Sequence, residues 1–181
     1  MPGQRLTVAA PLAAVLIVVL LIWANSQAEV PAMHLTAKLQ ITIVNKEYAS
    51  HNVLPTSTIG VPGGIMNAST YLSDGLNGRY PLYSENIGDH GGTILIHIES
   101  RVVRNYTLGD FFAVWGEPIG PNRTFTLSSN RTSPAQENQF FWDMCIINPV
   151  TNFRTPSFDW GSHVLKDGET VDLLFSTIGC S

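Results

Sequence analysis

The stretch YTLGDFFAVWG, residues 106–116, decides the fold, because it carries the clearest helix signal after the first 28 residues. Thr107 and Asp110 have the spacing of a capping box, in which each side chain accepts a hydrogen bond from the other residue's backbone N–H. Large apolar side chains follow at helical intervals, and Gly116 supplies a stop. These side chains belong to Leu108, Phe111, Phe112 and Trp115. We expect a short helix that buries this stripe against a sheet, at about 1.5–3 kcal/mol per large side chain.

Strand patterns lie on both sides of this helix. Residues 35–43 alternate apolar and polar side chains as in a half-buried strand, and residues 93–99 place isoleucines on one face and His97 on the other. Residues 55–92 are rich in Gly, Pro, Ser and Asn, and we expect a long ordered excursion there. Further strands are expected at 51–54, 124–127, 140–147 and 170–175, the last paired with 162–165 through the turn Lys166-Asp167-Gly168.

This order of elements predicts an α+β fold dominated by strands, with a mixed β-sheet packed on one short helix after an N-terminal transmembrane helix. A β-sandwich is the alternative. The segments 41–44, 107–112 and 165–171 resemble elements of a ubiquitin-like β-grasp domain, as in small sulfur-carrier proteins. That family ends in an exposed Gly-Gly tail, whereas this chain ends in Gly179-Cys180-Ser181. The resemblance implies a β-grasp-like fold without carrier chemistry.

Residues 1–28 are expected to be a membrane anchor or a signal peptide. No side chain from Leu6 to Ala28 is charged, and a helix of this length spans roughly 26–35 Å, enough to cross a hydrocarbon core of about 30 Å. Because Arg5 precedes the apolar run, the N-terminus should stay cytoplasmic and the C-terminal part of this single-pass cell-membrane protein should be extracytoplasmic. The alternative is a protein secreted after cleavage near Ala28.

The rest of the chain is predicted to hold a spacer, residues 29–34, and a single extracytoplasmic domain, residues 35–181. Its two cysteines, Cys145 and Cys180, form an even pair in an oxidising compartment, and we expect a disulfide between them. Four Asn-x-Ser/Thr sequons predict a glycoprotein. The sequons begin at Asn67, Asn105, Asn122 and Asn130.

The predicted strand and helix also share one longer motif, IHIES at 96–100 followed by YTLGDFF at 106–112 and Trp115-Gly116. This motif resembles a group of uncharacterised, membrane-anchored extracytoplasmic proteins of archaea, notably ammonia-oxidising lineages, and of some bacteria. Members often carry His-x-His just before the strand, where this chain has Leu82-Tyr83-Ser84-Glu85. The resemblance implies an anchored extracytoplasmic protein and assigns no activity.

His90, His97 and Glu99 are candidate ligands of a copper or zinc ion, since imidazole and carboxylate groups bind both metals. His97 and Glu99 share one face of the predicted strand. A hydrogen-bonded surface pair is the alternative explanation for them. No other cofactor is expected.

Composition and motifs narrow the function further. A net charge of −4 and the lack of a Lys/Arg cluster argue against nucleic-acid binding, and the common catalytic motifs are missing. We therefore expect a membrane-tethered extracytoplasmic binding or structural module without catalytic activity. Its partners would be the membrane and an envelope protein contacted by residues 55–92. The alternatives are an extracytoplasmic copper- or zinc-binding protein and a cell-surface enzyme with a dispersed active site.

Overall fold

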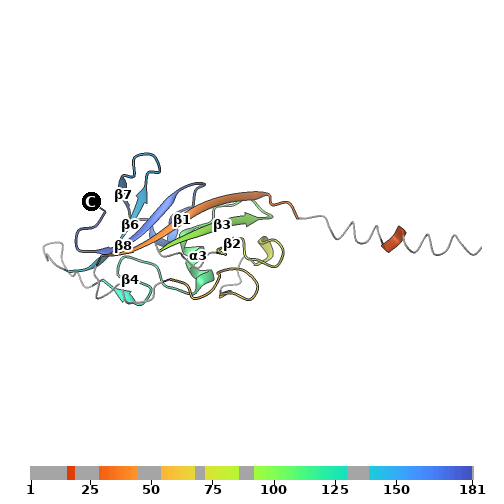
Figure 1. Ribbon diagram of the computed structural model, residues 1–181, viewed down its shortest axis with the longest axis horizontal. Coiled ribbons are helices and arrows are strands. Elements are labelled where there is room, and N and C mark those ends of the chain that lie inside the picture. The colour runs from red at the N-terminus through yellow and green to blue at the C-terminus, as the bar shows by residue number, and fades with distance from the viewer. Residues whose placement is uncertain are drawn as a thin grey trace, which may run out of the picture. The chain divides into compact units, whose positions relative to one another are not determined.

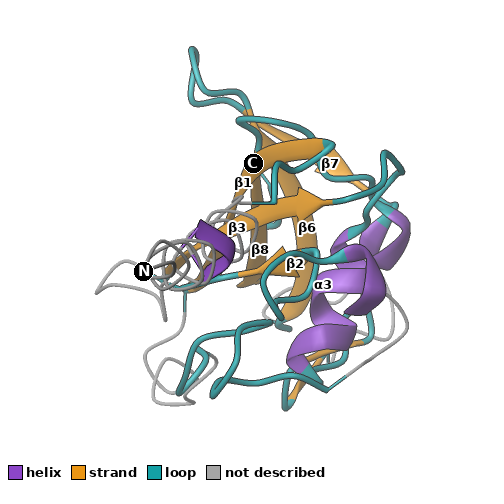
Figure 2. Ribbon diagram, turned by 90° about the vertical axis from the view of Figure 1, so that its right-hand side faces the viewer, coloured by secondary structure: helices purple, strands orange, loops and turns teal. Residues whose placement is uncertain are grey.

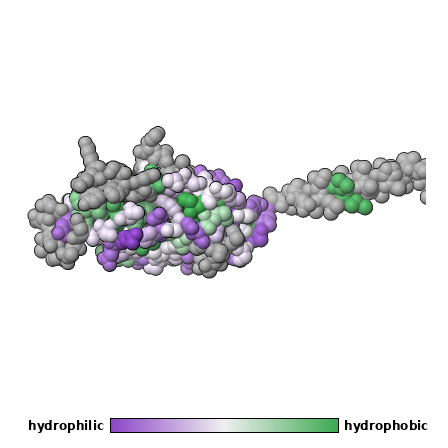
Figure 3. All heavy atoms as spheres, turned by 90° about the horizontal axis from the view of Figure 1, so that it is seen from below, coloured by the Kyte–Doolittle hydropathy of each residue, from purple (hydrophilic) through white to green (hydrophobic). Residues whose placement is uncertain are grey.

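The computed structural model describes residues 16–18, 29–44, 54–67, 72–85, 92–129 and 139–180. The chain divides into two compact units, residues 1–30 and residues 31–181. In the first unit, residues 16–18 are helical and apolar (Figure 3), and the other residues of the predicted segment 1–28 lie outside the described part. Within the described residues, no helix is both long and apolar enough to cross a membrane.

The second unit is built on one six-stranded sheet with the order β2-β3-β1-β8-β6-β7 (Figure 1). A separate two-stranded ribbon, β4-β5, lies in the segment after the helix. The main helix is α3, Leu108–Trp115, and two short 3₁₀ turns are η1, Leu72–Asp74, and η2, Trp160–Ser162. The strands are β1 Met33–Ile43, β2 Leu82–Tyr83, β3 Thr93–Ser100, β4 Arg123–Thr124, β5 Leu127–Ser128, β6 Phe141–Ile147, β7 Arg154–Ser157 and β8 Thr170–Ser176.

The pairing of these strands makes the sheet mixed. β1 runs antiparallel to β3 and parallel to β8, while β6 runs antiparallel to both β8 and β7. Along the chain, β1 and β3 form an antiparallel pair, α3 follows, β6 and β7 form a second antiparallel pair, and β8 returns to the centre of the sheet parallel to β1. This order is a β-grasp-like arrangement. The predicted strand-dominated α+β fold is confirmed, and the described residues form this mixed sheet with a helix rather than the alternative β-sandwich.

Helix α3 begins and ends as the sequence predicts. The Thr107 hydroxyl accepts a hydrogen bond from the Asp110 amide at 3.1 Å, and the Asp110 carboxylate accepts one from the Thr107 amide at 2.9 Å. Gly116 ends the helix at φ 86°, a left-handed conformation that glycine adopts without steric cost. The four large side chains of the stripe are at most 5% exposed. They face the sheet, along one side of which α3 lies (Figure 2).

The core between α3 and the sheet is rich in aromatic rings. Phe112 and Trp115 of the helix meet Phe125 at ring-centroid distances of 5.4 and 5.0 Å, and Phe125 meets Trp142 at 6.0 Å. The Trp142 indole N–H donates to the Leu127 carbonyl at 2.9 Å, so this buried polar atom is satisfied. The ribbon β4-β5 therefore closes one end of the core.

Three details of the strand predictions are wrong. Residues 162–165 do not pair with β8, because Ser162 ends η2 and Val164 bridges Thr107 instead. The predicted strand 124–127 is a tight ribbon whose turn passes through Phe125 at φ 56°. Strand β1 begins at Met33, so the last two residues of the predicted spacer 29–34 belong to the sheet.

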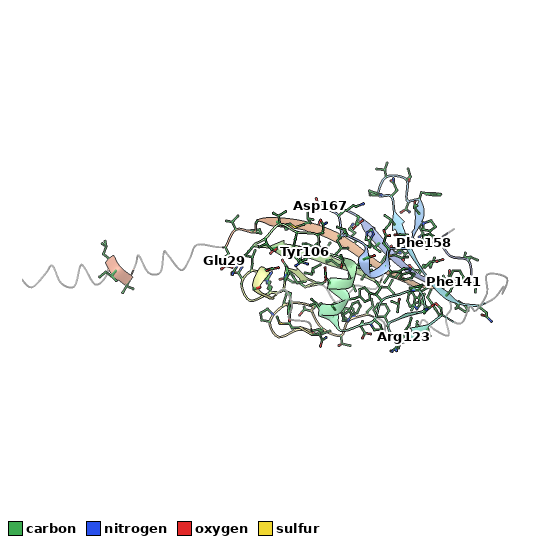
Figure 4. The ribbon with its side chains drawn as sticks, turned by 180° about the vertical axis from the view of Figure 1, so that it is seen from behind. Glu29, Tyr106, Arg123, Phe141, Phe158 and Asp167 are labelled. Atoms are coloured by element: carbon green, nitrogen blue, oxygen red, sulfur yellow. A yellow bond between two sulfur atoms is a disulfide. The ribbon has the colours of Figure 1, made fainter. Side chains whose placement is uncertain are left out.

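The turn Lys166-Asp167-Gly168 does form, but it joins other partners. The Asp167 carboxylate accepts a hydrogen bond from the Thr36 amide at 2.9 Å, and the Gly168 amide donates to the Thr36 carbonyl at 2.7 Å (Figure 4). The turn thus delivers β8 to β1 in parallel register rather than back to residues 162–165. A long-range contact has replaced the local hairpin.

The described parts of the excursion 55–92 are ordered, as expected. Ile59 is fully buried and bridges both Ile65 and Ser84. Leu82 of β2 is also fully buried and extends the sheet beyond β3. Of the predicted strand 51–54, residues 51–53 lie outside the described part and Leu54 is not in a strand. The excursion therefore contributes an edge strand and core residues.

The disulfide between Cys145 and Cys180 is confirmed, with an S–S distance of 2.01 Å. Cys145 lies on the sheet face opposite α3, where it packs with Leu174 and Cys180 in a small second cluster. The bridge therefore fixes the C-terminal segment onto β6 and β8.

Loss of half of the capping box should destabilise the domain. In Asp110→Ala, we expect the free energy of unfolding to fall by about 1 kcal/mol, because the Thr107 amide loses its acceptor and the helix N-terminus loses a favourable charge. The matched variant Asp110→Asn keeps an acceptor oxygen and should lose clearly less. Urea unfolding of both variants measures this. Equal losses would show that the hydrogen bond contributes nothing.

Removal of the disulfide should have a larger effect. The bridge closes a loop with a sequence separation of 35 residues. On the chain-entropy model, the double variant Cys145→Ala/Cys180→Ala should lose about 3–4 kcal/mol of unfolding free energy. Wild-type protein treated with a reductant is the control and should lose a similar amount. A loss well below about 1 kcal/mol in both samples would contradict the expectation.

Candidate binding face on the open side of the sheet

The face of the sheet opposite α3, here called the open face, collects the polar side chains of the central strands. On β1 these alternate with the buried Ala37, Leu39 and Ile41, and on β3 with three fully buried isoleucines. The open-face residues of β1 and β3 are partly or fully exposed. They are His34, Thr36, Lys38, Gln40 and Thr42 on β1, and Leu95, His97 and Glu99 on β3.

Tyr83 anchors a polar cluster at the β2 end of the open face. Its ring stacks on the His97 imidazole with centroids 5.0 Å apart, and the Arg79 guanidinium carbon lies over the Tyr83 ring, 5.0 Å from its centroid. The Tyr83 hydroxyl donates to the Glu99 carboxylate. Glu99 also lies 3.6 Å from His34 Nε2. Residues from β1, β2, β3 and the loop before β2 therefore meet here.

The environment of Tyr83 holds its hydroxyl in the protonated form. Burial raises the pKa of Tyr83 to about 12, and the hydrogen bond to Glu99 and the negative charge of Glu99 act in the same direction. Arg79 acts in the opposite direction and offsets part of this effect. The Tyr83 side chain is thus a hydrogen-bond donor to Glu99 throughout the physiological pH range.

Two of the three predicted metal ligands are near each other. His97 and Glu99 share the open face of β3, as the strand pattern predicts, but each already contacts Tyr83. His90 lies outside the described residues. Among the residues that the structure describes, no group of three or more His, Cys, Asp or Glu side chains is arranged to hold a metal ion. A copper or zinc site involving His90 stays a prediction.

A cavity of about 480 Å³ opens at the other end of the open face. This volume lies within the range of about 300–1,000 Å³ typical of small-molecule sites. One wall is the disulfide residue Cys180, so the C-terminal segment helps to shape the cavity. The lining residues are Gln40, Ile147, Asn152, Phe153, Arg154 and Cys180.

An ion pair holds Arg154 in the cavity wall. Arg154 Nη2 lies 2.9 Å from Asp172 Oδ2, across strand β6, and Asp172 is fully buried. The other carboxylate oxygen, Oδ1, accepts a hydrogen bond from the Thr42 hydroxyl at 2.9 Å. Thr42 in turn accepts from the Gln40 amide at 3.3 Å. A chain of polar contacts therefore connects two of the lining residues, Gln40 and Arg154, through Asp172.

Burial makes the charged form of the Asp172 carboxyl group less favourable. Burial raises its pKa above the ordinary value, while the Thr42 hydrogen bond and the Arg154 charge lower it in part. Oδ2 has no hydrogen-bond partner despite its closeness to Arg154, so the contact is an ion pair without hydrogen-bond alignment. A buried carboxylate in this state depends on Arg154 for compensation.

Sequence reasoning missed this pair. The one available signal was the position of Asp172 inside the apolar strand Thr170–Ser176, where an acid interrupts a run of large side chains. Nothing local connects it to Arg154, because the contact depends on the order of the strands in the sheet. Residue spacing along the chain carries no record of that order.

Three of the four predicted glycosylation sites are described, and all three asparagines are exposed: Asn67, Asn105 and Asn122. Asn67 also donates a hydrogen bond from its side-chain amide to the Trp115 carbonyl at 2.7 Å. Asn130 lies outside the described residues. Exposure is compatible with glycans at these positions, and their occupancy stays a prediction.

Comparison with known proteins adds no functional assignment: no protein-family model, curated protein or solved structure matches the chain. The geometry of the open face and the disulfide are therefore the features that bear on function.

The raised pKa of Tyr83 makes a pH-dependence testable. The folded value is about 12 against 10.0 for an unperturbed tyrosine, so the contribution of Tyr83 to stability is complete below pH 10 and is lost as the pH rises to about 12. Tyr83→Phe should therefore flatten the fall of unfolding free energy in this interval. Ultraviolet absorbance of the phenolate, compared between wild type and Tyr83→Phe, gives the midpoint directly. A difference titration centred near pH 10 would refute the assignment.

Proposed function

We propose that residues 31–180 form a non-catalytic extracytoplasmic binding module, tethered to the cell membrane by residues 1–28, that contacts an envelope component through its open face. The supporting observation is the division of the sheet into two faces. The core covers the α3 face of the sheet, whereas the other face presents the Tyr83 cluster at its β2 end and the 480 Å³ cavity at its other end. Strands carry Tyr83, His97 and Glu99 of the cluster and Gln40, Ile147 and Arg154 of the cavity, and side chains on strands are held more firmly than side chains on loops.

The disulfide supports the extracytoplasmic part of the proposal. Structural disulfides form and persist in oxidising compartments and are rare in the cytosol. Cys145 is fully buried and Cys180 is 8% exposed, so the bridge is part of the packed structure rather than an accessible thiol pair. Both cysteines lie on the open-face side, where the bridge shapes the cavity wall.

The two sides of the domain differ in the kinds of side chain that they expose. The helix side mixes hydrophilic and hydrophobic side chains (Figure 3), and a cavity of about 610 Å³ lies there beside Trp115 and Phe125. On α3 itself the exposed residue Ala113 is small and neutral, whereas the open face carries charged and aromatic groups in contact with one another. Specific recognition needs such placed polar and aromatic groups.

Site-specific photo-crosslinking tests the proposal. A photo-crosslinking amino acid is placed at Lys38, which is exposed on the open face, or at Ala113, which is exposed on the helix side. In irradiated native cells, we expect a covalent adduct at position 38 and none at position 113. Gel mobility and the intact mass of the purified chain report the adduct.

The controls separate the two parts of the proposal. Thiol labelling of the same cells should find no reactive cysteine before reduction. Adduct at position 113 but not at position 38 would contradict the open face as the contact surface. Adduct at neither position would contradict a binding module, and cysteines that react before reduction would contradict the extracytoplasmic location.

A further inference from the structure

The cavity at Arg154 combines groups that suit one class of ligand. The amide side chains of Gln40 and Asn152 each carry both a donor and an acceptor, and the Arg154 guanidinium carries several donors in a plane. Ile147 and Cys180 add apolar surface. A ligand that fits this lining must present several groups able to donate and to accept hydrogen bonds, together with some apolar surface.

The charge of the cavity is balanced internally. Among the described residues of the lining, Arg154 is the one that carries a charge, and its guanidinium is paired with the buried carboxylate of Asp172 at 2.9 Å. A ligand anion would have to compete with Asp172 for the same guanidinium, and a ligand cation would meet an already compensated carboxylate that is fully buried. The electrostatics of the site therefore favour a neutral ligand.

Phe153 supplies an exposed aromatic surface beside these polar groups. Its side chain lines the cavity and is 69% exposed. Exposure of the apolar ring to water costs free energy in proportion to its area, so a ligand that covers the ring would be favoured. A pyranose ring has one face of C–H groups that packs against an aromatic ring, and a rim of neutral hydroxyls that both donate and accept. The C–H face of such a ring matches Phe153, and its hydroxyls match the amides and the guanidinium of the lining.

We propose that the cavity binds a neutral sugar ring. The C–H face of the ring packs on Phe153, and its hydroxyls exchange hydrogen bonds with the amides of Gln40 and Asn152 and accept from Arg154. Asp172 is a positioning residue, which holds Arg154 in the wall without touching the sugar. The inference rests on the proposed function, since it names the class of component that the open face binds, either a free saccharide or a sugar unit within an envelope glycan.

The test uses the full-length oxidised chain in nanodiscs made from phospholipids without sugar headgroups. Two-dimensional NMR follows titration with methyl glycosides of glucose, mannose and N-acetylglucosamine, with trisaccharides of the same sugars, and with glucuronic acid. We expect saturable shifts of the backbone amides of Gln40, Asn152, Phe153 and Arg154 with at least one neutral sugar. Stronger binding of the trisaccharide would identify a glycan chain, and equal binding would identify a free saccharide.

Two matched phenylalanine variants localise the contact. Phe153→Ala should weaken binding by about tenfold, the size expected for loss of one aromatic packing contact. Phe158→Ala removes another largely exposed ring, which follows β7 and does not line the cavity, and it should leave the affinity unchanged (Figure 4). Both side chains are largely exposed, so both variants should keep the melting temperature of the wild type.

Three results would overturn the inference: no saturable shift with any sugar, a preference for glucuronic acid, or equal effects of Phe153→Ala and Phe158→Ala. An adduct at Lys38 in the cross-linking experiment together with any of these results would leave the binding module standing and remove only the sugar. Absence of that adduct together with sugar-dependent shifts at the cavity would leave the sugar site standing and contradict contact with a cellular partner through the open face.

Discussion

The parallel pairing of β1 with β8 is the constraint on which the rest of the structure depends. Parallel neighbours cannot be joined by a tight turn, so the chain between Ile43 and Thr170 must leave the sheet and return to it. In doing so it places β3 and β6 on the two outer sides of the central pair and lays α3 across one face. The buried faces of the central strands, with Leu39 and Leu173 fully buried, then require the aromatic stripe of α3 as their cover.

This arrangement also decides what the open face can carry. Because α3 and the ribbon β4-β5 fill one side, the side chains that alternate away from the core are left to interact with one another. At the β2 end they form the stack of Arg79, Tyr83 and His97, and at the other end the disulfide and Arg154 cover Asp172. The disulfide and the hydrogen bonds from the Ile178 and Gly179 amides to Ser176 Oγ hold the C-terminal segment, so Cys180 contributes to the cavity wall through a bond that depends on the redox state of the domain.

The sequence predicted those elements whose signals are local. The capping box and the aromatic spacing of α3 lie within ten residues, and the alternation in β1 and β3 is readable without any partner strand. The error at residues 162–165 arose because Lys166-Asp167-Gly168 is a genuine turn whose flanks pair elsewhere: Leu165 donates to the Tyr106 carbonyl, and Asp167 accepts from Thr36. Part of the candidate site could be predicted because its signals are local as well. His97 and Glu99 share a face by simple alternation, whereas Tyr83 and Asp172 acquire their partners through strand order, which spacing along the chain does not encode.

The ion pair between Arg154 and Asp172 is poorly explained by stability alone. The Asp172 side chain is fully buried and the Arg154 side chain is 32% exposed, so the desolvation cost falls mainly on the carboxylate and offsets much of the attraction between the charges. Here the raised pKa of Asp172 shows that desolvation outweighs the favourable contacts of the carboxylate, and the neighbouring residues Leu173 and Leu174 show that this strand readily accommodates apolar side chains. What the pair does achieve is geometric. It fixes a guanidinium across β6, next to Gln40 and Phe153, at a place where a long unpaired side chain would sample many rotamers. Under the proposed function, this contact would serve the cavity, because the side chains of a binding site must be held in place by neighbouring groups.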